Sequence, residues 1–238
     1  GTMGTFTAHI TGGMPEIMTL IDMAPLNYPT KFGIDPKTTR GDASVDLDIR
    51  VPMLSNVKVD DIAIDIKAAV KAFAVSLGRL RLAEGDVTFG IDNDTLHQAG
   101  TVMLADQRFT FDWTEDFKTA QQVTTRVNAR GLLTPAVREA LNINIAKVIS
   151  GAWPVSAVIT GHRGALLQAV ANLTLTPAVI TVPFINQGKA AGESASARVT
   201  VNFTPDGQVS DQVFNVSGAN VAASGTAIFN RAGELARL

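Results

Sequence analysis

The side chains that most often carry chemistry are few and scattered in this chain of 238 residues. Its three histidines, His9, His97 and His162, lie far apart and form no pair at the spacing of metal ligands. Each falls in a predicted strand or turn, where a lone histidine is usually solvated or hydrogen-bonded. We therefore predict no metal site at the histidines.

The carboxylate and hydroxyl side chains do not indicate a catalytic or metal site either. Asp60 and Asp61 are adjacent, and adjacent strand residues point to opposite faces, so the two carboxylates do not converge on one atom. The Asp-Asn-Asp sequence at 92–94 lacks calcium-loop spacing and is typical of a turn. The Gly-His-Arg-Gly sequence at 161–164 has no nucleophile elbow or phosphate-binding frame. No serine has an assignable base and there is no cysteine. We therefore expect no enzyme activity, no cofactor and no metal.

Composition narrows the class of protein further. The chain is 46% hydrophobic but only 6% aromatic, and its net charge of −2 offers no basic surface for nucleic acid. The longest apolar runs are too short to span a membrane as a helix. The length suits one large all-β domain or two ordinary domains, and we interpret the chain as an internal segment of a longer protein.

Strict alternation of apolar and polar residues dominates the chain and predicts β-strands with one apolar and one wet face. Residues 43–51 alternate without a break. Residues 61–74 alternate over about twice the usual strand length, so we expect a bend or a bulge inside that strand. About twelve strands are predicted in total, including a hairpin around Asp106–Gln107, with further turns at 92–94, 161–164 and 204–207.

Two short helices interrupt the strands. One is predicted at about 14–23, with Pro15 near its first position and with Ile17, Leu20 and Ile21 on one side. The other is predicted at about 133–141, with Thr134 as N-cap, Pro135 in the first turn, and Val137, Ala140 and Leu141 on one side.

A repeat relates the two halves of the chain at an offset of about 125 residues. Phe89 aligns with Phe214, and Gly100 aligns with Gly225. We therefore predict two β-rich repeat units, 1–131 and 132–238, each with one of the helices. The aligned glycines are expected to allow the bend that curls the sheet.

The aliphatic strand faces have two possible explanations. Two sheets, or a sheet and the helices, can pack these faces together as an ordinary core. Alternatively, part of the face stays open as a groove, which a ligand, a partner or a membrane must cover. An acyl chain suits such a groove, because each buried CH₂ contributes about 0.8 kcal/mol.

Residues 172–192 resemble a segment of the AsmA-like proteins, in their YhdP-like branch. The family pattern has an Asp-Leu-Thr opening, an alternating apolar stretch, a proline with apolar neighbours and a Trp-x-Lys-x-x-Gly close. The matching residues here are Leu173, Thr174, Ala178, Ile180, Pro183, Phe184, Lys189 and Gly192. Asn172 replaces the acidic residue, and no tryptophan precedes Lys189. Residues 111–117 are similar to the family's Trp-x-Glu-x-Phe strand end, and the resemblance extends over nearly the whole chain.

The resemblance implies a fold and a function. Such proteins are anchored in the inner membrane of Gram-negative bacteria and cross the periplasm, where they are similar to bridge-like lipid-transfer proteins. The implied fold is mainly β: an extended, twisted antiparallel sheet curled into an apolar groove, with two or so short helices. Phospholipid or another acyl lipid would be the partner, and membrane contact would be made only by other parts of the full-length protein. The predicted lining residues are Val45, Leu47, Ile49, Ile62, Ile64, Ile66, Leu173, Val199, Val201, Val221 and Phe229.

Two other functions stay open. A β-rich scaffold could assist outer-membrane protein or envelope assembly by pairing through its exposed strand edges. A carbohydrate-binding module would need a cluster of exposed aromatic residues, and this chain has one tyrosine and two tryptophans.

Overall fold

The structure is a computed structural model, and the chain is mainly β. The described residues are 2–23, 28–31, 34–54, 56–58, 61–182, 187–229 and 235–237, without the side chains of residues 28, 31, 182, 187, 229 and 235–237. This part of the chain forms a large antiparallel sheet of thirteen strands and a small sheet of three, which is more than the twelve or so predicted. The large sheet begins at β1 and ends at β16, and it is not closed into a barrel.

The chain divides into two compact units. Unit 1 comprises residues 1–103 and 111–124, and unit 2 comprises residues 104–110 and 125–238. The hairpin between them is shared, because β6 (Gln107–Asp116) contributes residues to both units. The unit boundary predicted after residue 131 lies inside β7 (Thr125–Leu133), and the relation of the units as repeats stays a prediction.

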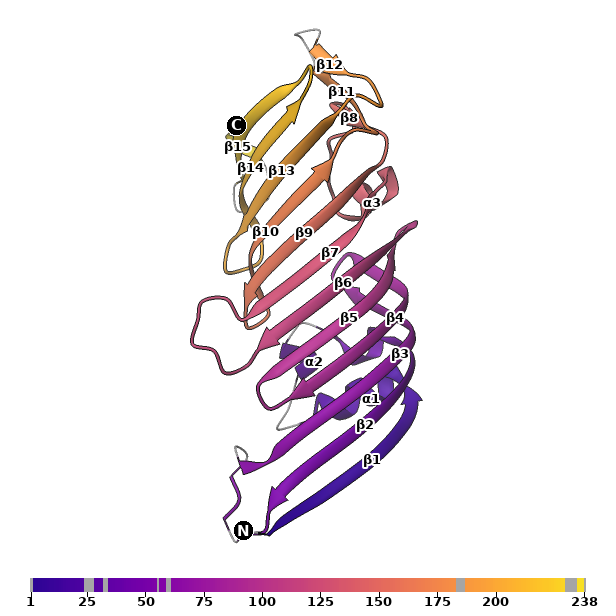
Figure 1. Ribbon diagram of the computed structural model, residues 1–238, viewed down its shortest axis with the longest axis vertical. Helices are drawn as coiled ribbons and strands as arrows, with labels where there is room; N and C mark the ends of the chain where they lie inside the picture. Colours follow the sequence, from indigo (N-terminus) through magenta and orange to yellow (C-terminus); the bar gives the residue numbers. More distant parts are fainter. Residues whose placement is uncertain are drawn as a thin grey trace. The chain divides into compact units, whose positions relative to one another are not determined.

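The strands of unit 1 lie side by side in chain order (Figure 1). Besides part of β6, they are β1 (Met3–Gly13), β2 (Arg40–Pro52), β3 (Ala63–Leu77), β4 (Leu80–Asp92) and β5 (Thr95–Leu104). The bend or bulge predicted inside the long strand is confirmed as a bulge: the register of β3 against β4 shifts between Val70 and Phe73, and Ala72 has a φ of 52°.

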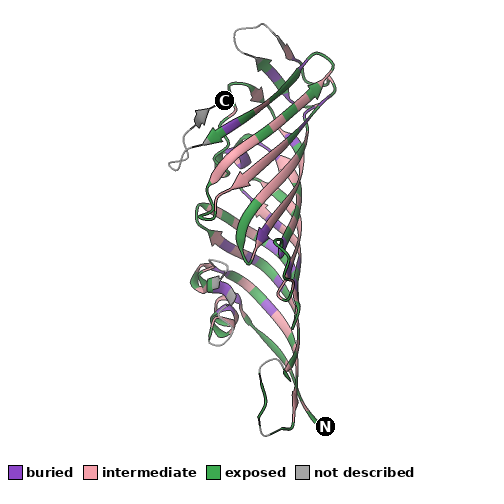
Figure 2. Ribbon diagram, turned by 90° about the vertical axis from the view of Figure 1, so that its left-hand side faces the viewer, coloured by how far each residue is buried: buried purple, intermediate pink, exposed green. Residues whose placement is uncertain are grey.

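The helices of unit 1 lie on one side of its sheet (Figure 2). They are α1 (Met14–Ile21), α2 (Tyr28–Lys31) and the 3₁₀ turn η1 (Pro36–Thr38). The prediction of α1 is confirmed, and its predicted apolar side is right except for Leu20: Ile17 and Ile21 are half-buried on the same face as the buried Met14 and Met18, whereas Leu20 is 57% exposed. Since α1 contacts β2 and η1, these two methionines contribute the helix's part of the core.

Unit 2 has the same kind of sheet and a second, small one. Its large-sheet strands, besides β7, are β9 (Trp153–His162), β10 (Ala165–Thr174), β13 (Ala195–Phe203), β14 (Val209–Gly218), β15 (Ala222–Phe229) and β16 (Leu235–Arg237). The small sheet contains β8 (Ile149–Ser150), β11 (Val179–Val182) and β12 (Gln187–Lys189). The second predicted helix is α3 (Pro135–Ala140), where the Thr134 hydroxyl accepts from the Val137 amide at 3.2 Å as the predicted N-cap.

The most deeply buried side chains of unit 2 include one from α3. Val137, Trp153 and Leu175 have no exposed surface. Arg138 is also buried, and its guanidinium lies 4.2 Å from the centre of the Trp153 ring. Leu141 was predicted to lie on the apolar side of this helix with Val137, but it is 39% exposed.

The predicted turns are confirmed. The β5–β6 turn lies at residues 105–106, the β9–β10 turn at 163–164 and the β13–β14 turn at 205–207. The Gly207 amide donates to the Thr204 carbonyl at 2.8 Å.

Candidate functional site

One face of the unit 1 sheet is a continuous aliphatic surface. Ile49 lies opposite Ile64 and Leu47 opposite Ile66, and Ile66 in turn lies opposite Ile91. Directly opposed residues share a face, so these side chains form rows across β2, β3 and β4. The predicted lining residues of this unit are all half-buried: Val45, Leu47, Ile49, Ile62, Ile64 and Ile66.

The same face is closed where the helix packs. Ala43 lies opposite Val70, and Val70 opposite Val87, and all three are buried. These three residues have the same strand parity as Val45 and Leu47, so they lie farther along the same face. The face of unit 1 is therefore core at one end and only partly covered along the remaining rows (Figure 2).

Unit 2 repeats this arrangement with smaller side chains. Leu173 lies opposite Ala197, and Val199 and Val201 lie opposite Ala171 and Ala169. Leu173, Val199 and Val201 are half-buried. Two predicted lining residues differ from these: Val221 is buried, just before β15, and the side chain of Phe229 lies outside the described residues.

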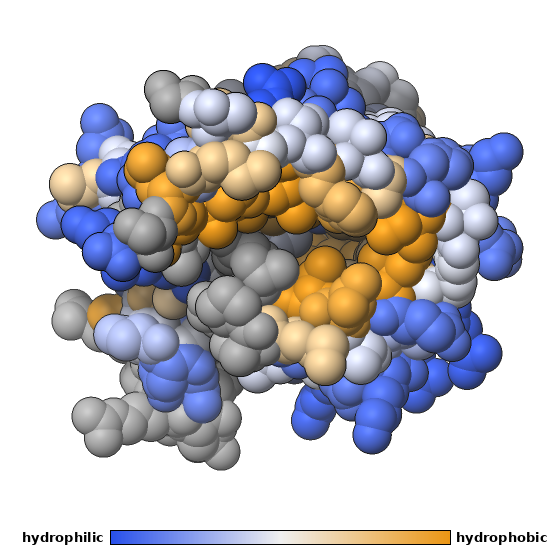
Figure 3. Space-filling view, turned by 90° about the horizontal axis from the view of Figure 1, so that it is seen from below, coloured by the Kyte–Doolittle hydropathy of each residue, from blue (hydrophilic) through white to orange (hydrophobic). Residues whose placement is uncertain are grey.

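The space-filling view shows hydrophobic residues gathered around a hollow, with hydrophilic residues on the outside (Figure 3). The face of the unit 1 sheet opposite to the aliphatic rows is polar. There Asp46 contacts His9 at 2.7 Å and Asp48 contacts Arg50 at 2.9 Å. The sheet is therefore amphipathic, with ion pairs on one face and aliphatic side chains on the other.

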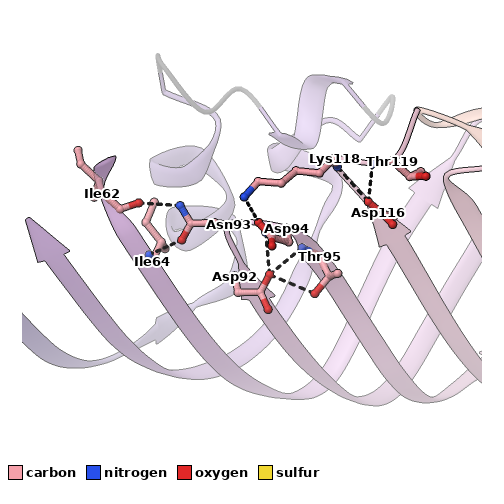
Figure 4. Close-up of polar contacts among 9 residues, drawn as sticks. All are labelled: Ile62, Ile64, Asp92, Asn93, Asp94, Thr95, Asp116, Lys118 and Thr119. Carbon is pink, nitrogen blue, oxygen red and sulfur yellow. Dashed lines mark hydrogen bonds and ion pairs between the residues drawn. The ribbon is translucent and has the colours of Figure 1, made fainter. Parts of the chain in front are cut away.

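The turn between β4 and β5 ties the strand ends of unit 1 together (Figure 4). Asn93 donates from its side chain to the Ile62 carbonyl at 2.6 Å and accepts from the Ile64 amide at 2.7 Å. The Asp92 carboxylate accepts from the amides of Asp94 and Thr95, and these hydrogen bonds lower the pKa of Asp92. The sequence at 92–94 is thus a turn, as predicted.

The loop after β6 joins the same group. The Asp116 carboxylate accepts from the amides of Lys118 and Thr119 at 2.9 and 2.8 Å, and the Lys118 ammonium pairs with Asp94 (Figure 4). Polar contacts therefore line this end of the unit, next to the start of the aliphatic rows at Ile62 and Ile64.

Two of the three histidines each contact one aspartate. His9 pairs with Asp46, and His97 contacts Asp112 at 2.8 Å, both on exposed surface. Among the described residues no three His, Asp or Glu side chains are grouped as metal ligands. Asp60 lies outside the described residues, and Asp61 accepts from the Lys58 amide.

One acidic residue of the stretch at 111–117 is held inside the fold. Glu115 is only 2% exposed, and its carboxylate accepts a hydrogen bond from the Thr124 hydroxyl at 2.7 Å. A carboxylate held in this way binds the loop after β6 to the strand, and it is turned away from solvent.

Sequence reasoning missed two buried cations. Arg138 donates to the carbonyls of Leu133 and Gly151 at 3.0 and 2.8 Å, and its burial lowers its pKa. The Lys189 ammonium donates to three carbonyl oxygens, of Thr176, Ala178 and Ala190. The one available signal was the place of Lys189 in the family-like segment 172–192.

No protein-family model, curated protein or solved structure matches this chain. The resemblance to AsmA-like proteins therefore stays a prediction. No helix in the described part of the chain is both long and apolar enough to cross a membrane.

Proposed function

We propose that this chain binds acyl lipids, most simply phospholipids, along an apolar groove formed by the aliphatic face of its curled sheet. It would be a segment of an AsmA-like protein that is anchored in the inner membrane and conducts lipids across the periplasm. The observation that carries this proposal is the half-burial of aliphatic rows in both units, from Val45 and Ile64 to Leu173 and Val201.

The uncovered part of these rows favours a ligand that removes it from water. Aliphatic side chains gain about 25 cal/mol for each Å² of surface removed from water, so a partly covered face favours a ligand that covers it. In unit 1, where α1 contacts β2 and η1 contacts β3, the face is buried at Val70, and the rows of Leu47 and Ile49 stay half-buried. An acyl chain consists of methylene groups and has no polar atoms, so it needs no hydrogen-bond partners on this face.

The proposed mechanism is passive. Acyl chains lie against the aliphatic rows, while headgroups stay in water near polar strand ends such as the Asp92–Thr95 turn. The described residues contribute binding surface only, and lipids exchange along the rows without a covalent step. No nucleic acid is expected to bind.

Native mass spectrometry of the purified chain, followed by solvent extraction and lipid analysis, tests the proposal. We expect stoichiometric phospholipid, and a reduced load in Ile64→Asp, whose charge would lie in the aliphatic row. The matched control is Ala63→Asp, because Ala63 is the preceding residue of the strand, is exposed and faces the other side. In unit 2 the test variant is Val201→Asp, which should also reduce the lipid load. Its control is Asn128→Asp, at an exposed position. A chain that stays empty after incubation with phospholipid vesicles would refute the proposal.

A scaffold that pairs through its strand edge is a second candidate. β1 stands at the end of the strand order, runs for 11 residues and carries Phe6 with 58% exposure. Its free backbone groups could accept another strand. In this case the chain would be lipid-free, and a β-strand peptide from an envelope protein would bind it, with binding lost when proline replaces alternate residues of β1.

A further inference from the structure

A hollow of about 530 Å³ lies over β7, β9, β10, β13 and β14 of unit 2. A cross-strand row runs along it, in which Arg130 lies opposite Ser156, Ser156 opposite Asn172, Asn172 opposite Arg198 and Arg198 opposite Asn215. Directly opposed residues share a face, so all five side chains lie on one surface. It is the reverse of the aliphatic face, because Leu173 neighbours Asn172 in the strand.

The charge of this hollow is not compensated. Arg130 and Arg198 line it, and no acidic residue does. Arg130 is exposed and has no ion pair or hydrogen bond with any described residue. The acid farther along the same face, Asp211, is already held by the Asn202 amide at 2.8 Å and by the Ser210 hydroxyl at 2.9 Å.

The hollow on the polar face of unit 1 is different. It contains Asp46, Asp48 and Asp65 beside His9 and Lys67, and its bases pair with its acids. The excess of positive charge is therefore specific to the hollow of unit 2, and is not a general property of the polar faces of these sheets.

Arg198 extends across the hollow towards the strand of Arg130. The strands of these two arginines are three ladder spacings apart, which separates their backbones by about 14 Å. The Arg198 guanidinium donates to the side-chain oxygen of Asn172 at 3.3 Å, so it leans over β10 towards Arg130. The Ser156 hydroxyl and the Asn172 amide lie between the arginines and add neutral donors.

We propose that this hollow is a binding site for phosphate groups, with Arg130 and Arg198 as its charged ligands. Two guanidinium groups, with hydroxyl and amide donors between them and no carboxylate, match the oxygens of a phosphate or a pair of phosphates. The phosphate could belong to a small phosphorylated compound or to lipid headgroups at a membrane surface. The proposal does not rest on acyl-lipid binding, because it concerns the other face of the sheet.

Titration calorimetry of the full chain with pyrophosphate at low salt tests this site. A second arm measures co-sedimentation with vesicles of phosphatidylglycerol and, for comparison, of phosphatidylcholine, whose zwitterionic headgroup has no net charge. We expect saturable binding that is weakened about tenfold in Arg130→Gln and in Arg198→Gln, the effect of losing one charge-assisted contact. The matched control is Arg126→Gln, since Arg126 is an exposed residue on the same face of β7 but does not line the hollow.

The two arms distinguish the source of the phosphate. Arginine-dependent binding of pyrophosphate identifies a small phosphorylated ligand, and arginine-dependent binding of phosphatidylglycerol vesicles alone identifies a headgroup surface. Both results support the site. The proposal is overturned if neither probe binds, or if Arg126→Gln weakens binding as much as the two lining variants do. Circular dichroism of each variant confirms that the sheet is folded.

Discussion

Phe214 and Gly225 face one another across the β14–β15 ladder, and the ring of Phe214 lies over the glycine. A Cβ added at position 225 would come 2.8 Å from the Cζ atom of that ring. Gly100, which aligns with Gly225 in the sequence, has another neighbour: a Cβ there would collide with the backbone carbonyl of Asp86. The two glycines were expected to be equivalent, but their surroundings differ.

This difference predicts unequal effects of alanine at the two positions. Gly100→Ala should lower the free energy of unfolding by about 1–3 kcal/mol, because the backbone of β4 must move to admit the methyl group. Gly225→Ala should lower it by less than about 1 kcal/mol, because the half-buried Phe214 ring can rotate aside. Urea unfolding of both variants measures these values. Equal losses would mean that Gly225 is as constrained as Gly100.

The strands and their faces could be predicted because alternation is a local property of the sequence. Once Val45, Leu47 and Ile49 alternate with polar residues, only registers of one parity put them on the same side as Ile64 and Ile66, as in the observed pairing. The excess length of the next run likewise predicted a bend or bulge, which is the bulge at Ala72. Turn residues such as Asp92 act on amides two and three positions away, so they too could be assigned from sequence.

The contacts that depend on distant segments could not be predicted. Nothing near Lys189 in the sequence indicates that its ammonium meets the carbonyls of Thr176 and Ala178. In α1 only Leu20 was mispredicted: Met14, Ile17, Met18 and Ile21 follow the helical period and are buried or half-buried, whereas Leu20 lies at the margin of that face and is exposed. Which aliphatic rows are core and which are half-buried depends on where that helix lies.

Arg138 should be a major source of stability in unit 2. It is 4% exposed, donates to two backbone carbonyls and lies over the Trp153 ring. Arg138→Met keeps an apolar stem but leaves both carbonyls without this donor, so we expect a loss of about 2–4 kcal/mol in thermal or urea unfolding. Arg126→Met, at an exposed position of β7, is the control and should change stability by less than about 0.5 kcal/mol. A similarly small change in Arg138→Met would show that the buried guanidinium contributes no net stability.

Lys189 should stabilise the junction of β12 with the segment that precedes β11. Its ammonium is the shared donor to the carbonyls of Thr176, Ala178 and Ala190. We expect Lys189→Met to cost about 2–4 kcal/mol, since these acceptors lose their donor in a buried place. Amide hydrogen exchange should also accelerate around residues 175–190 before it does elsewhere. Lys147→Met, at an exposed position of the same unit, should leave both measurements unchanged.

The stability of the β4–β5 turn should depend on pH through the carboxylate of Asp92. Amide hydrogen bonds from Asp94 and Thr95 hold the pKa of Asp92 below its usual value of 3.8 in the folded chain. The carboxylate therefore contributes stability that is fully present above the unfolded pKa of about 4 and is lost as the pH falls through the lower folded pKa. Asp92→Asn has no such titration. Calorimetry between about pH 7 and about pH 2 should show the melting temperatures of the natural chain and the variant converging below about pH 4. A difference that stayed constant across this range would mean that the turn does not depend on the charge of Asp92.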